Sequence, residues 1–106
     1  TASQDIFTIS NTNGAQIFQV MFNCSSSNFS VSKMFNVAHN FGNTPVTNKT
    51  VDSGAYSSNN FIVNFTDVSS TGVKCAITNN AATASADITV TLILGGSPQA
   101  VTLTKH

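Results

Sequence analysis

The feature of this sequence that most restricts its fold is an alternation of apolar and polar residues with a period of two. Successive side chains of an extended chain point to opposite faces, so each alternating run predicts a strand with one buried face. In the stretch IFQVMFNC, the alternate residues that share one face are Phe18, Val20, Phe22 and Cys24. The stretches 59–68 and 86–94 alternate in the same way, and all three runs predict strands.

Further strand candidates fill most of the remaining chain. They are weaker runs at 5–10, 28–32, 33–39, 46–51, 72–78 and 99–105. Lys33 interrupts an alternation that runs from Phe29 to Val37, which predicts a bulge or a break at this residue. Clusters of Gly, Asn, Ser and Pro separate the candidates at intervals of about eight to twelve residues, as in antiparallel sandwiches.

The composition favours strands throughout. Thr, Val, Ile, Phe, Asn and Ser dominate, whereas the good helix formers Glu, Arg, Leu and Lys are absent or scarce. A length of 106 residues suits one domain. We therefore expect residues 1–106 to form a single all-β domain, an antiparallel two-sheet sandwich of about 7–9 strands that is immunoglobulin-like or jelly-roll-like.

Charged residues are few, and their place is taken by uncharged polar ones. The four acids are all Asp, the four bases are all Lys, and the net charge is zero, while 13 Asn, 14 Ser and 14 Thr supply the polar surface. Four scattered lysines form no basic stripe, which argues against nucleic acid and anionic membranes as partners. No apolar segment reaches the length of about 18 residues needed for membrane insertion. The chain begins with Thr1, which we take as minor support for a processed, secreted protein.

The two cysteines predict a disulfide bond. Cys24 and Cys75 each lie on the apolar face of a predicted strand, and an even pair in a secreted-looking chain predicts a disulfide between the two sheets. Such a bond would stabilise the fold by roughly 4 kcal/mol. Two free buried thiols are the main alternative. A nucleophilic cysteine served by His39 has no local sequence signature, and zinc lacks closely spaced ligand pairs.

An inter-sheet cysteine pair in a β domain of this size resembles immunoglobulin-like domains in outline. That family also carries a Trp between its cysteines and a Tyr two residues before the second one. This chain has no Trp, and Val73 stands two residues before Cys75. The resemblance therefore implies the sandwich architecture and not membership of the family.

No pattern predicts a catalytic, cofactor or metal site. The aspartates lack the D-x-D-x-D spacing that gathers oxygen ligands around calcium, and no Asp lies in an apolar context suited to glycoside hydrolysis. Asp52 and Asp67 are predicted to cap turns. We expect a protein without enzymatic activity and without a cofactor or a bound metal.

Four N-x-S/T triplets mark potential glycosylation sites, at Asn23, Asn28, Asn48 and Asn64. A chain this rich in Asn, Ser and Thr contains about three or four such triplets by chance, so their number carries no argument. If the source organism glycosylates, Asn28 and Asn48 are the candidate acceptors, because both lie near predicted loops.

Two predicted loops, 41–45 and 52–60, form a candidate ligand site. Phe41 is the Phe best placed to be exposed, Tyr56 is the only Tyr, and Asp52 adds a carboxylate. Aromatic rings beside Asn and Asp side chains are typical of sugar sites, so one functional hypothesis is a secreted module that binds a glycan or a protein. A small secreted toxin or inhibitor is a further hypothesis, which fits the size and the predicted disulfide but has no specific residue to support it.

Apolar residues also occur on faces that a solvated sandwich leaves polar. They are Ile17, Met21, Ile62 and Ile93. Several such residues on a surface with few charges to deter pairing favour burial against another molecule. Our leading hypothesis is an extracellular, secreted or surface-displayed structural or adhesive subunit of a fibre, pilus or coat. It would bind copies of itself or surface proteins through strand edges and these residues.

Overall fold

The protein folds into two antiparallel sheets of four strands each. The computed structural model describes residues 3–11, 15–25, 29–40, 45–56, 60–69, 72–80, 87–95 and 101–106. The eight strands in this part of the chain are β1 (Ser3–Asn11), β2 (Ala15–Ser25), β3 (Phe29–Asn40), β4 (Val46–Tyr56), β5 (Phe61–Ser69), β6 (Gly72–Asn79), β7 (Asp87–Leu94) and β8 (Val101–Lys105). The prediction of an all-β, antiparallel, two-sheet arrangement is confirmed.

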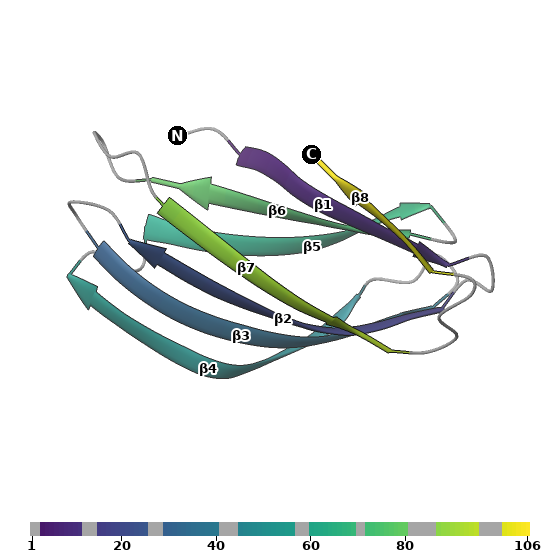
Figure 1. Ribbon diagram of the computed structural model, residues 1–106, viewed down its shortest axis with the longest axis horizontal. Coiled ribbons are helices and arrows are strands. Elements are labelled where there is room, and N and C mark those ends of the chain that lie inside the picture. Colours follow the sequence, from purple (N-terminus) through teal and green to yellow (C-terminus); the bar gives the residue numbers. More distant parts are fainter. Residues whose placement is uncertain are drawn as a thin grey trace.

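We call the sheet with the order β5-β6-β1-β8 sheet A and the sheet with the order β4-β3-β2-β7 sheet B. Figure 1 shows β6, β1 and β8 in the upper layer and β2, β3 and β4 in the lower one. The first two strands lie in different sheets, whereas strands A and B of an immunoglobulin domain share one sheet. The strand order therefore differs from the immunoglobulin one.

The alternating runs became strands at the expected places, and two of the weaker candidates are joined in β3. The candidates 28–32 and 33–39 are a single continuous strand, so the break predicted at Lys33 is wrong. Lys33 keeps its place in the alternation between Val31 and Phe35. The bulge lies in the neighbouring strand instead: Phe35 pairs with Lys49 and Met34 with Val51, which leaves Thr50 as the extra residue of β4.

The core is a chain of phenylalanine rings that joins the two sheets. The ring contacts in sequence are Phe7–Phe18, Phe18–Phe65, Phe65–Phe35, Phe35–Phe22 and Phe22–Phe61, with centroid distances of 5.4–6.1 Å. Most are edge contacts, which aromatic quadrupoles favour. Because β1 and β5 belong to sheet A and β2 and β3 to sheet B, these contacts fix how the sheets are placed along one another.

The predicted disulfide is not supported, because both cysteines are buried free thiols. The ladder explains why. Cys75 pairs with Phe7 on one side and Phe65 on the other, and both rings pack on Phe18. Cys24 lies six residues beyond Phe18 in β2, which is roughly 20 Å along the strand at about 3.3 Å per residue. A disulfide needs Cα atoms within about 7 Å.

We expect both thiols to resist modification in the folded protein. Burial raises the pKa of Cys75 to about 12. Burial, and to a lesser extent the charge of Asp87, also raises the pKa of Cys24. With a pKa near 12, only about one Cys75 in ten thousand is a thiolate at pH 8. Labelling with a chromogenic disulfide reagent should therefore be slow in buffer, slowest at Cys75, and fast in denaturant. Rapid labelling of both residues in buffer would contradict the burial.

Candidate functional site

The outer face of sheet B gathers exposed apolar side chains at one end. Residues paired across an antiparallel ladder share a face. One row of this face contains Ile17, Ala38 and Val46, and the next contains Gln19, Asn36, Asn48 and Ile93. The exposed fractions are 57% for Ile17, 72% for Val46 and 61% for Ile93. The half-buried Met21, Met34 and Val51 continue the apolar surface in the third row.

We call these residues, Ile17, Met21, Met34, Ala38, Val46, Val51 and Ile93, the apolar end of sheet B. Four of them, Ile17, Ala38, Val46 and Ile93, line a shallow hollow of about 470 Å³ together with Asn36 and Asn48. Gly95 closes one side, where its N–H donates to the Ile17 carbonyl at 2.8 Å. The side-chain oxygen of Asn36 is shielded there without a hydrogen-bond partner among the described residues.

The opposite end of the same face is polar but almost uncharged. Its rows contain Asn23, Ser32, Ser53 and Thr89, followed by Ser25, Ser30, Ala55 and Asp87. Asp87 is the only charged residue among the described outward positions of sheet B. Another copy could thus pack on this face and desolvate few ions, whose removal from water costs several kcal/mol each.

The structure brings together three of the four residues that the sequence placed on a contact surface. Ile17, Met21 and Ile93 lie at the apolar end of sheet B. Ile62 lies on β5 in sheet A, where its outward partner is Thr78. The same outer face carries the ion pair between Lys74 and Asp5, at 3.5 Å. Ile62 is therefore separate from the apolar end.

The structure describes only part of the two predicted ligand loops. Residues 52–56 continue β4, which corrects the prediction of a loop from 52 onward. Turn-forming residues in this stretch are held extended by the ladder to β3, where Tyr56 pairs with Phe29. Phe41 lies outside the described residues, as does the glycosylation candidate Asn28. The other candidate, Asn48, is exposed in β4 rather than in a loop.

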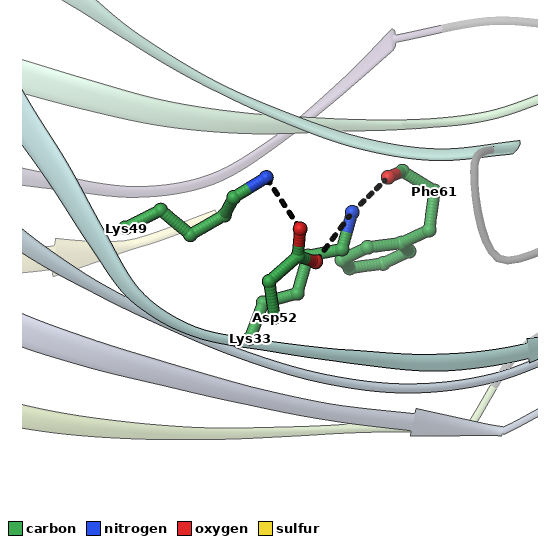
Figure 2. A network of polar contacts seen from close by, with 4 residues as sticks. All are labelled: Lys33, Lys49, Asp52 and Phe61. Carbon is green, nitrogen blue, oxygen red and sulfur yellow. Dashed lines mark hydrogen bonds and ion pairs between the residues drawn. The ribbon is translucent and has the colours of Figure 1, made fainter.

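Asp52 points toward the space between the sheets, where it joins two lysines. Its carboxylate lies 2.7 Å from Lys49 Nζ and 3.8 Å from Lys33 Nζ. Lys33 Nζ also donates to the Phe61 carbonyl at 3.1 Å and lies 6.0 Å from the Phe61 ring centre. Figure 2 shows Lys33 between Asp52 and Phe61. The bulge at Thr50 places Lys49 and Asp52 on the same side of β4, so this cluster links sheet B to sheet A.

We expect Asp52 to make stability depend on acid pH. The hydrogen bond from Lys49, with the charges of Lys49 and Lys33, outweighs desolvation and holds the pKa of Asp52 below its ordinary value of 3.8. A lowered pKa stabilises the fold above the unfolded carboxyl's pKa, and this stabilisation is lost as pH falls through the folded pKa. The difference in urea midpoint between wild type and Asp52→Asn should therefore shrink below about pH 4. A difference that grows in acid would contradict this cluster.

A second polar cluster lies inside the sandwich around His39. Its Nε2 is 2.6 Å from Asp67 Oδ1, and its Nδ1 lies against the side-chain amide of Gln16. The His39 side chain is fully buried, whereas that of Asp67 is 31% exposed. Because His39 and Gln16 belong to sheet B and Asp67 to sheet A, this cluster also joins the sheets. His39 is eight residues from Val31, the β3 partner of Cys24, so His39 and Cys24 are not neighbours.

Sequence reasoning missed both clusters, although the alternation contained a signal for them. Asp67 is an even number of residues from Phe61 and Phe65 in its strand, and His39 is two residues from Val37. Both side chains therefore belong to the inner face. Asp67, which was predicted to cap a turn, lies within β5 and contacts His39 of the other sheet. Among the described residues, no three His, Cys, Asp or Glu side chains are close enough together to hold a metal ion. No helix in the same residues is suited by length and hydropathy to span a membrane.

A comparison with protein-family models found no match, and comparisons with curated proteins and with solved structures found none either.

Proposed function

We propose that this protein is a non-enzymatic structural or adhesive subunit of an extracellular assembly of the fibre, pilus or coat type. Its copies associate through the outer face of sheet B. The observation that carries this proposal is the apolar end of that face, where Ile17, Val46 and Ile93 are each more than half exposed. Since both thiols are free, the extracellular location rests on the composition and not on a disulfide.

The size of the face suits a stable contact between two copies. Four strands about 4.8 Å apart, with a length of about 11 residues at about 3.3 Å per residue, cover roughly 700 Å². Stable protein interfaces bury about 800 Å² on each partner. The face is also self-compatible, because a second copy brings the same nearly uncharged surface and creates no repulsion between like charges.

The edges of sheet B offer a second contact, which explains how pairs would extend into a longer assembly. β4 and β7 are its edge strands, and they run antiparallel to each other because the four strands alternate in direction. Copies related by translation would therefore bring β4 of one beside β7 of the next as an antiparallel pair. Such a head-to-tail contact does not close and builds a filament.

The test is sedimentation velocity of the purified protein over a wide range of concentration. We expect oligomers whose formation is weakened at least about tenfold by Ile93→Lys, since an ammonium group would have to be desolvated at the contact. Ile62→Lys is the matched control, because it places the same charge on the outer face of sheet A. A protein that remains monomeric at the highest concentration, or equal weakening by both variants, would refute the proposal.

A further inference from the structure

One of the described glycosylation triplets lies at the apolar end of the proposed contact surface. Asn48, in the triplet Asn48-Lys49-Thr50, is exposed on β4 and pairs with Asn36. It belongs to the same cross-strand row as Ile93 and lines the same hollow. Val46, the most exposed large apolar residue of the apolar end, is two positions away on the same face.

The other described triplets lie away from the apolar end. Asn64 is exposed on β5 and pairs with Ala76 on the outer face of sheet A. Asn23 lies at the polar end of sheet B, where its side-chain oxygen accepts a hydrogen bond from Ser32 at 2.9 Å. Asn48 is thus the acceptor that the register places at the apolar end, and Asn64 provides a natural comparison on the opposite side of the sandwich.

We propose that Asn48 is an N-glycosylation site whose glycan prevents a second copy from docking on sheet B. This inference rests on the proposed function. In the modification, the Asn48 amide nitrogen bonds to the anomeric carbon of a lipid-linked oligosaccharide and gives up one proton. The bond from that carbon to the lipid pyrophosphate breaks, and the pyrophosphate leaves with the electron pair.

The steric reason is the small space between packed sheets. Two sheets that pack face to face lie about 10 Å apart, and side chains fill that space. An N-linked glycan is bulky and strongly hydrated. A glycan on Asn48 would therefore keep Ile93 and Val46 of one copy from reaching the apolar end of another. The same glycan on Asn64 would leave this face open.

The experiment compares the chain made in a bacterial host without N-glycosylation with the chain secreted from a eukaryotic host. Peptide mass spectrometry locates the glycans, and sedimentation velocity measures association. We expect the unmodified protein to associate and the protein glycosylated at Asn48 to associate at least tenfold more weakly. Asn48→Gln and Thr50→Ala, which remove the triplet in two ways, should restore association of the secreted protein. Asn64→Gln should not.

The outcomes separate this inference from the function on which it rests. If the bacterial protein does not associate, the proposed function fails and the inference fails with it. If the bacterial protein associates but the secreted protein carries no glycan on Asn48, the inference alone is wrong. The same holds if the glycosylated protein associates as tightly as the unmodified one. Circular dichroism of each variant checks that the sheets are intact.

Discussion

Replacing Phe22 with alanine should lower the free energy of unfolding by about 3–5 kcal/mol, the range for a large aromatic removed from a packed interior. Phe22 has no exposed surface. Its ring lies 6.1 Å from that of Phe35 in sheet B and 6.1 Å from that of Phe61 in sheet A. The substitution therefore removes contacts within one sheet and between the two. The total stability of a domain is only about 5–15 kcal/mol, so the variant should be close to unfolding.

The measurement is urea unfolding followed by circular dichroism, with the midpoint and slope of both proteins compared. Gln19→Ala is the control, because Gln19 is exposed on the opposite side of the same strand and should change stability by less than about 0.5 kcal/mol. A loss below about 1 kcal/mol for Phe22→Ala would mean that the sheets do not pack through these rings.

The alternation predicted the strands and the inner face because both depend on local geometry alone. The residues that line the core, such as Phe18, Val20 and Val73, were recognisable from their parity. The strand β4 was harder, since its second half contains the consecutive turn-forming residues Asp52, Ser53 and Gly54. Pairing with β3 overrides that local preference, and pairing partners cannot be read from one strand by itself.

The position of each strand along its neighbours was beyond sequence reasoning, and the errors about sites follow from this. The alternation showed that Cys24 and Cys75 both face the core. The ring contacts around Phe18 set how far each strand extends along its neighbours, and this placement keeps the two cysteines apart. Parity also showed that Ile62 and Ile93 point outward. Only the sheet order shows that they belong to opposite faces of the sandwich. The sequence therefore predicted that an exposed apolar surface exists, but not which residues form the apolar end of sheet B.

Replacing His39 with alanine should lower the free energy of unfolding by about 2–3 kcal/mol. His39 is buried, and its ring connects Asp67 of sheet A with Gln16 of sheet B. The alanine variant leaves a cavity and deprives the Asp67 carboxylate of its donor. Breaking a fully buried pair costs about 3–5 kcal/mol, and the expected loss is smaller because water reaches the partly exposed Asp67.

His106→Ala is the matched control for this prediction. His106 is exposed, and its Nε2 lies 2.8 Å from Thr8 Oγ1, so its loss should cost less than about 0.5 kcal/mol. A double-mutant cycle with Asp67→Ala then isolates the pair, and we expect a coupling energy of about 1–2 kcal/mol. Additive losses would contradict a direct bond between His39 and Asp67. In that case the Phe rings and the Lys33 cluster would still join the two sheets.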